Sequence, residues 1–164
     1  MELEKHLTSQ AYIQLLIDTQ KKKLDVLNQL KEKAEEQEKI INENFDEDYF
    51  LQIISEKENL ILILTELDDG FEQIYERVKE ELKENKFRFE TEIVTLKNYI
   101  TSITDISVKL QALELRNKNK FDHILTQKRR EIMKSKVSTQ TAVKYYKTMT
   151  NQQEPQSYFY DKKK

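Results

Sequence analysis

The sequence predicts an all-α protein: an elongated antiparallel helical bundle or coiled coil of about three long helices, followed by a C-terminal amphipathic helix and a tail. Three observations predict this class. The 164 residues include one glycine and one proline, so tight turns are few. Charged residues make up 35% of the chain, which favours long solvent-exposed helices. Apolar residues recur at helical spacing through most of the sequence.

The first helix is predicted from about Thr8 to Asn44. Its apolar stripe follows one helical face and consists of Ile13, Leu16, Ile17, Leu24, Leu27, Ala34 and Ile41. Polar Gln20 and Glu38 interrupt this stripe. Five further residues broaden it on one side, so the helix could meet more than one neighbour: Tyr12, Leu15, Val26, Leu30 and Ile40.

The second helix is predicted to begin after Phe45, with Asp46 as its N-cap and acidic residues in its first turn. Its stripe is the strongest periodic signal in the chain and consists of Phe50, Ile53, Ile54, Leu60, Ile61, Leu64, Leu67, Phe71, Ile74, Tyr75, Val78 and Leu82. The stripe continues in phase across Gly70, which predicts a tolerated glycine inside the helix, and a hinge is the alternative.

A polar turn at 84–86 separates the second helix from a third. The stripe of the third helix consists of Phe87, Phe89, Ile93, Leu96, Ile100, Ile103, Leu110, Leu113, Phe121, Ile124 and Leu125. Helices of this length are roughly 50 to 60 Å long, so they must run alongside one another to bury their stripes. Residues 1–125 are therefore predicted to form the antiparallel bundle.

The chain beyond Leu125 changes in character. Residues 126–150 are predicted to form a basic amphipathic helix, and 151–164 a flexible aromatic and basic tail. The charges are sorted along the chain: Lys31 to Glu92 holds 20 acidic and 9 basic residues, whereas Arg116 to Lys164 holds 4 acidic and 13 basic ones. This polarity could steer a partner, attract nucleic acid, or let the acidic and basic arms of one bundle attract each other.

Composition bears on several classes of function. The chain has no cysteine, which removes disulfides, thiolate nucleophiles and the usual zinc sites, and which fits a reducing compartment. The first residues lack the features of a signal peptide, and the longest aliphatic run, 60–64, is too short to span a membrane. We therefore expect a cytoplasmic protein that does not insert into membranes.

The sequence offers no constellation that points to catalysis. His6 and His123 lie far apart without companions at metal-ligand spacing, and no glycine-rich phosphate loop or nucleophile elbow is present. We therefore expect no enzyme activity, no metal, no cofactor and no small-molecule substrate. The basic run 128–130 could contact phosphates or, less readily, a membrane surface, although nucleic acid is the weaker alternative to a protein partner.

The aromatic residues point to a binding function. Five of the 15 lie in the last 20 positions, beyond the predicted core, where exposed aromatics can anchor a partner and lysines can form a rim. The alternative is a tail that folds back onto the bundle. The predicted partner-binding residues are Leu125, Ile132, Met133, Val137, Val143, Tyr145, Tyr146, Met149, Tyr158, Phe159 and Tyr160.

Several segments together resemble the FlgN-like flagellar type III export chaperones. They are residues 12–16 (Tyr-Ile-Gln-Leu-Leu), 56–60 (Glu-Lys-Glu-Asn-Leu) with Leu64 and Leu67, 145–147 (Tyr-Tyr-Lys) and 157–163 (Ser-Tyr-Phe-Tyr-Asp-Lys-Lys). The resemblance covers most of the chain. It implies a helical cytosolic chaperone that holds aggregation-prone hook–filament junction subunits, delivers them to the export gate, and grips its client with the C-terminal amphipathic segment.

The sequence is also compatible with two other classes of function. A structural coiled-coil component of the flagellar export apparatus would use the long stripes in a permanent homo-oligomer and would not need the tail. A nucleic-acid-binding helical protein would use the basic C-terminal region, with an affinity that falls steeply with salt.

Overall fold

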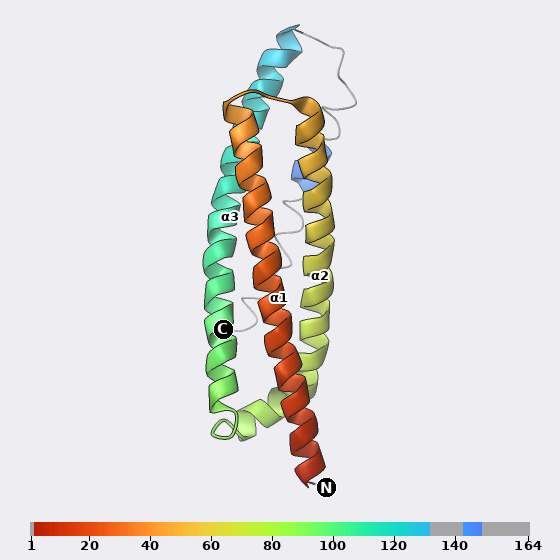
Figure 1. The fold of residues 1–164 in the computed structure, drawn as a ribbon, viewed down its shortest axis with the longest axis vertical. Helices are drawn as coiled ribbons and strands as arrows, with labels where there is room; N and C mark the ends of the chain where they lie inside the picture. Colours follow the sequence, from red (N-terminus) through yellow and green to blue (C-terminus); the bar gives the residue numbers. More distant parts are fainter. Residues whose placement is uncertain (1, 132–142, 149–164) are drawn as a thin grey trace. The chain divides into compact units, whose positions relative to one another are not determined.

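The computed structural model describes residues 2–131 and 143–148, and nearly all of them are helical (Figure 1). Helix α1 spans Glu2–Asn42, α2 spans Glu47–Glu84 and α3 spans Glu90–Glu131. A short helical segment at 143–148, here called the docked segment, follows α3 in the sequence. The described ranges contain no β-strand, so the predicted all-α class is confirmed.

The three long helices pack together, and the chain divides into two compact units. Unit 1 comprises Met1–Lys31 and Leu62–Lys109, and unit 2 comprises Glu32–Ile61 and Leu110–Lys164. Each unit therefore contains a part of every long helix. None of the helices in the described residues carries an apolar stretch long enough to cross a lipid bilayer.

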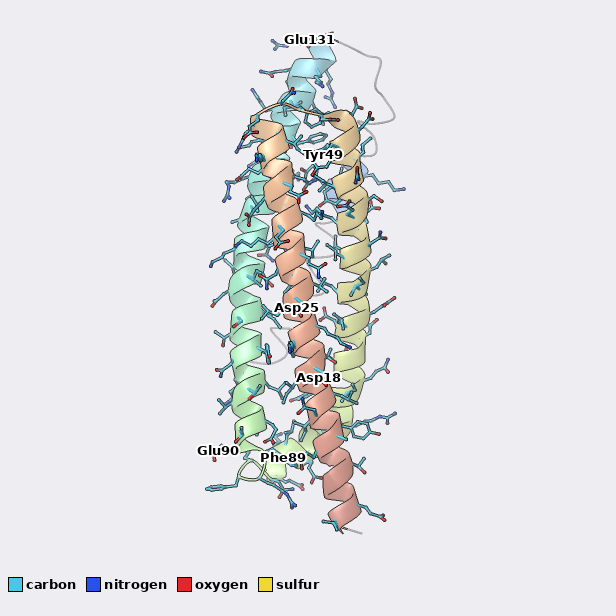
Figure 2. The ribbon with its side chains drawn as sticks, viewed as in Figure 1. Asp18, Asp25, Tyr49, Phe89, Glu90 and Glu131 are labelled. Atoms are coloured by element: carbon cyan, nitrogen blue, oxygen red, sulfur yellow. The ribbon has the colours of Figure 1, made fainter. Side chains whose placement is uncertain are left out.

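Helix α1 is longer at its start than the sequence predicts. It begins at Glu2 rather than near Thr8, because the intervening glutamate, lysine and leucine residues are good helix formers. The predicted stripe is buried at Ile13, Leu16, Leu27 and Ala34. Asp18 and Asp25 lie on the solvent-exposed face of the same helix (Figure 2).

Helix α2 begins as predicted. The Asp46 carboxylate accepts a hydrogen bond from the Tyr49 backbone N–H at 3.1 Å, and Glu47 and Asp48 occupy the first turn, where the helix dipole favours negative charge. The helix passes through Gly70 without a break, so the predicted interior glycine is confirmed and the hinge is not.

The predicted turn after Glu84 is confirmed, but the start of the third helix is not. The stripe was expected to begin at Phe87, which instead lies in the turn with 95% of its surface exposed. Phe89 is buried and directly precedes α3 (Figure 2). In this turn the Arg88 backbone N–H donates a hydrogen bond to the Asn85 carbonyl at 3.1 Å. The turn leaves the Phe87 ring in solvent and the Phe89 ring in the core.

Candidate partner-binding site

Four of the predicted partner-binding residues lie in the described part of the chain: Leu125, Val143, Tyr145 and Tyr146. The other seven lie outside the described residues: Ile132, Met133, Val137, Met149, Tyr158, Phe159 and Tyr160. Leu125 and Val143 are half-buried. Helix α3 continues past Leu125 to Glu131 without interruption.

The burial of Tyr145 and Tyr146 contradicts one prediction from the sequence. The aromatics of the last 20 positions were expected beyond the core, yet Tyr145 is 1% exposed and Tyr146 is 5% exposed. The docked segment therefore packs against the long helices of unit 2, whereas the tail at 151–164, for which folding back was the alternative, lies outside the described residues. The expectation failed because apolar periodicity in so short a segment is too weak to predict burial.

An aromatic cluster in unit 2 receives Tyr146. The Phe50 and Phe121 rings stack with centroids 5.1 Å apart, and Phe45 lies 5.1 Å from Phe50. The Tyr146 ring is 5.5 Å from Phe121, and Tyr145 lies edge-on to Tyr146 at 5.1 Å. These separations are favourable for aromatic pairs. The docked segment thus joins a cluster to which both α2 and α3 contribute.

A lysine in the core of unit 2 receives Tyr145. Lys57 is fully buried, and its ammonium lies 4.8 Å from the centre of the Tyr145 ring, within the range of a cation–π contact. The same ammonium donates a hydrogen bond to the Gln37 side-chain oxygen at 2.6 Å and forms an ion pair with Glu114. One cation therefore links α1, α2, α3 and the docked segment.

Burial shapes the protonation of this group of residues. Burial lowers the pKa of Lys57, because the low-dielectric interior disfavours its charged form, and the Glu114 carboxylate opposes that shift. Burial raises the pKa of Tyr145 and Tyr146, and the Glu114 carboxylate adds to both increases. Both phenols are therefore held in the neutral, hydrogen-bond-donating form.

Several polar atoms of this core lack hydrogen-bond partners among the described residues. They are Gln37 Nε2, Glu114 Oε2, Asn117 Oδ1 and the Tyr145 hydroxyl. The Asn117 amide does donate to the Ala34 carbonyl at 2.9 Å. Each buried polar atom without a hydrogen-bond partner costs about 1–3 kcal/mol of stability. The hydrogen bonding of this core is therefore incomplete while the docked segment covers it.

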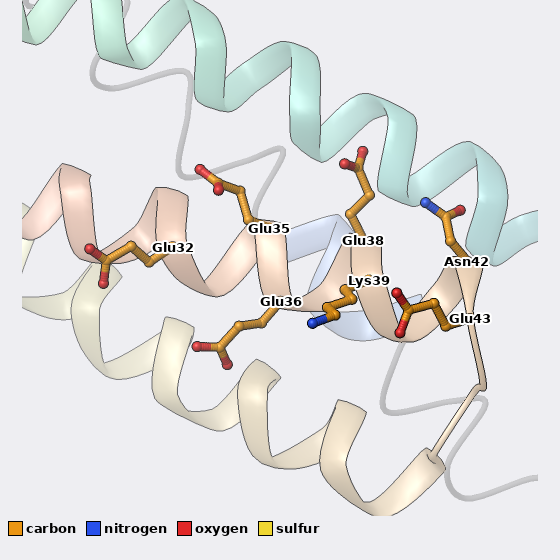
Figure 3. A pocket seen from close by; sticks show the side chains of 7 residues that line it. All are labelled: Glu32, Glu35, Glu36, Glu38, Lys39, Asn42 and Glu43. Atoms are coloured by element: carbon orange, nitrogen blue, oxygen red, sulfur yellow. The ribbon is translucent and has the colours of Figure 1, made fainter.

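The surface of unit 2 near the end of α1 is acidic. A shallow recess of about 670 Å³ lies along this stretch, lined by Glu32, Glu35, Glu36, Glu38, Lys39, Asn42 and Glu43 (Figure 3). Glu36 accepts a hydrogen bond from the Tyr49 hydroxyl at 3.1 Å, and Glu38 pairs with Arg116 at 3.4 Å. Because these carboxylates already have partners, we assign no ligand to the recess.

The remaining sequence candidates have ordinary surroundings. His123 is exposed and lies 3.2 Å from the Gln127 amide, and the side chain of His6 is outside the described part. Lys128 of the basic run lies 4.8 Å from the centre of the Phe45 ring. No group of three or more potential metal-ligating side chains occurs among the described residues.

Comparison of the chain with protein-family models, curated proteins and solved structures finds no match. The function is therefore inferred from the residues of the site itself. Sequence reasoning missed its polar members: Gln37, Lys57, Glu114 and Asn117. A signal for them was present, because Lys57 and Asn117 each lie four residues from buried apolar residues on both sides and so fill gaps in the stripes.

Proposed function

We propose that this chain is a cytoplasmic export chaperone that binds flagellar hook–filament junction subunits through helix–helix contacts. In this proposal it prevents their aggregation and delivers them to the flagellar type III export apparatus. The observation that carries the proposal is the docking of 143–148 on unit 2. A face that accepts a short amphipathic helix of its own chain offers the contacts that a client helix would use.

The proposed architecture is an antiparallel bundle with a client-binding C-terminal region at 126–150. Contacts within unit 2 support the antiparallel direction. Lys57 pairs with Glu114, and Phe50 stacks on Phe121, so position rises along α3 as it falls along α2. Likewise, Lys33 pairs with Glu56 at 2.7 Å and Glu36 accepts a hydrogen bond from the Tyr49 hydroxyl at 3.1 Å, so position rises along α1 as it falls along α2.

Binding rather than catalysis is supported by the location of the unusual ionisable groups. Lys57 and Glu114 have side-chain exposures of 0% and 5%, so neither offers a reactive atom to a dissolved substrate. Their contacts instead connect helices to one another. No cofactor or small-molecule substrate is therefore part of the proposal, and nucleic acid is not its partner.

The predicted partner contacts of Tyr145 and Tyr146 require an additional step. Both side chains are buried against unit 2, so they cannot touch a client until 143–148 has left that face. Release of the docked segment is therefore part of the proposed binding reaction.

The proposal is tested with the full-length chain and a purified hook–filament junction subunit. We expect a complex of defined stoichiometry and suppression of the light scattering that the subunit develops alone. An unrelated aggregation-prone protein serves as the control and should aggregate at an unchanged rate. Absence of a complex, or equal protection of both proteins, would contradict the proposal.

The mass of the chain in solution distinguishes the alternative, a scaffold component, from the chaperone. A permanent coiled-coil oligomer keeps its mass on dilution, whereas the chaperone should form its main assembly with the client. Sedimentation of the chain alone and with the subunit, over a range of concentrations, distinguishes the two.

A further inference from the structure

We propose that unit 2 carries an exchangeable binding site for a partner helix with two adjacent aromatic residues flanked by lysines, and that residues 143–148 occupy this site in the free protein. The site consists of Lys57, Glu114 and Phe121 and is here called the acceptor face. The inference rests on the proposed function only for the identity of the partner.

The acceptor face selects aromatic residues through two different contacts. The Lys57 ammonium lies 4.8 Å from the centre of the Tyr145 ring, and the Phe121 ring lies 5.5 Å from that of Tyr146. A cation–π contact and a ring–ring contact both need an aromatic side chain. An aliphatic pair at these positions would lose both contacts.

The charges around the acceptor face select the flanking residues. Glu114 and Glu58 lie close enough to Tyr145 to influence its pKa, and Glu114 and Asp122 do the same at Tyr146. The docked segment carries two lysines of complementary charge, Lys144 and Lys147, which are exposed on either side of the tyrosine pair. The fitting partner therefore carries basic residues beside its aromatic pair.

The present occupant is suited to exchange. Of the six described residues of the docked segment only Tyr145 and Tyr146 are buried, so few side chains hold it in place. Its fit is incomplete, because the Tyr145 hydroxyl and Glu114 Oε2 have no hydrogen-bond partners among the described residues. A partner helix that supplies a donor to Glu114 would bind with more favourable contacts.

The test uses the full-length chain and a fluorescent peptide with the sequence of residues 137–150. In the wild type, the docked segment competes for the acceptor face. The variant Tyr145→Ala with Tyr146→Ala vacates the face, so we expect it to bind the peptide at least ~10-fold more tightly than the wild type. Equal affinities, or weaker binding by the variant, would overturn the proposal.

Matched peptides and variants test the chemistry of recognition. A peptide with only the tyrosine at position 145 replaced by phenylalanine should bind at least as well, since the Tyr145 hydroxyl has no partner among the described residues, whereas a peptide with alanine at both tyrosine positions should not bind. Lys144→Ala with Lys147→Ala in the full-length chain is the control for the tyrosine variant, because both lysines are exposed. It removes only the flanking charges and keeps the buried rings, so it should raise peptide affinity much less than the tyrosine variant does.

A second measurement applies if the tyrosine variant fails to fold. The chain has no cysteine, so Lys147→Cys provides a single labelling position for an environment-sensitive dye on the docked segment. Adding the unlabelled peptide should change the dye signal saturably, whereas the same dye at Lys118→Cys on α3 should respond little. If the peptide binds and the signal of the dye at Lys147→Cys does not change, the peptide does not replace the docked segment and the proposal is contradicted.

The outcomes separate this inference from the proposed function. If the peptide exchanges with the docked segment but no junction subunit binds, the acceptor face stands and the chaperone proposal fails. If the subunit binds but the peptide binds the wild type and the tyrosine variant equally, the chaperone proposal stands and the acceptor face fails.

Discussion

Units 1 and 2 each bury a lysine in a helical core, but they do so in different surroundings. In unit 1, the Lys23 ammonium lies 2.6 Å from Asp68, whose side chain is 19% exposed. In unit 2, the partner of Lys57 is Glu114, which is only 5% exposed and lies beneath the docked segment. The ion pair of unit 1 therefore keeps contact with water, whereas the stability of the pair in unit 2 depends on the segment that covers it.

The largest expected difference follows from removing the acidic partner. Glu114→Ala leaves the buried Lys57 charge without a counter-ion, and we expect a loss of about 3–5 kcal/mol in the free energy of unfolding. Asp68→Ala should cost less, because water can reach the vacated space beside Lys23. Urea unfolding of both variants measures the difference. Equal losses would show that the two pairs do not differ in solvation.

A double replacement tests whether the loss of stability in Glu114→Ala comes from the unpaired charge. Lys57→Met with Glu114→Leu removes both charges and their desolvation cost, so we expect the stability to be within about 1 kcal/mol of the wild type, or higher. The lost Gln37 hydrogen bond limits the gain. If the double variant is as unstable as Glu114→Ala, the cost comes from packing rather than from the unpaired charge.

Two glutamines should respond with opposite signs. Gln20 in unit 1 is buried, and its amide nitrogen has no partner among the described residues, so Gln20→Leu should stabilise the protein by about 1 kcal/mol. Gln37 in unit 2 accepts a hydrogen bond from Lys57 at 2.6 Å, so Gln37→Leu should destabilise it by about 1.5–3 kcal/mol. Thermal and urea unfolding test both. A stabilising Gln37→Leu would contradict the role given to this contact.

Alkaline pH should also act on unit 2. The pKa values of Tyr145 and Tyr146 are raised above the usual 10.0, so between 10.0 and the folded values the unfolded chain loses protons that the folded chain keeps. Stability from these groups is fully present below pH 10.0 and falls as pH rises above it. Tyr145→Phe with Tyr146→Phe should remove this loss. Unfolding measured on both sides of pH 10.0 checks it.

Lys57 contributes with the opposite sign. Its folded pKa lies below the usual 10.5, so between these two values the unfolded chain binds the extra proton and stability rises with pH. In the double phenylalanine variant this rise should become visible without the tyrosine contribution. A flat profile below pH 10.5 in that variant would show that the Lys57 pKa is not lowered.

The smallest expected effect lies in unit 1. Gly70 is inside α2, and nothing lies within 4 Å of the position that a Cβ would occupy. Gly70→Ala should therefore stabilise the protein by up to about 1 kcal/mol, through higher helix propensity. A loss of stability in thermal unfolding would indicate that the glycine serves a purpose in unit 1 beyond the helix.

The long helices could be predicted because their signals are long and regular. The α2 stripe from Phe50 to Val78, the Asp46 cap and the interior Gly70 all follow from spacing and residue type. The turn before α3 was harder, because Phe87 and Phe89 have the same residue type and the backbone geometry alone exposes one and buries the other.

The candidate site could be predicted only in part. Tyr145 and Tyr146 were identified as important, but their burial depends on contacts with Lys57 and Phe121, which are distant in the sequence. The buried lysines were missed because charged residues are rarely buried, so a lysine in an apolar stripe is first interpreted as an interruption. Only its partners on other helices show that it belongs to the core.

The proposed replacement of residues 143–148 by a client can be followed by hydrogen–deuterium exchange of the full-length chain with and without a purified junction subunit. We expect 143–148 to lose protection in the complex, while the parts of α2 and α3 around Lys57 and Phe121 remain protected. A complex in which 143–148 keeps its protection would contradict the proposed replacement.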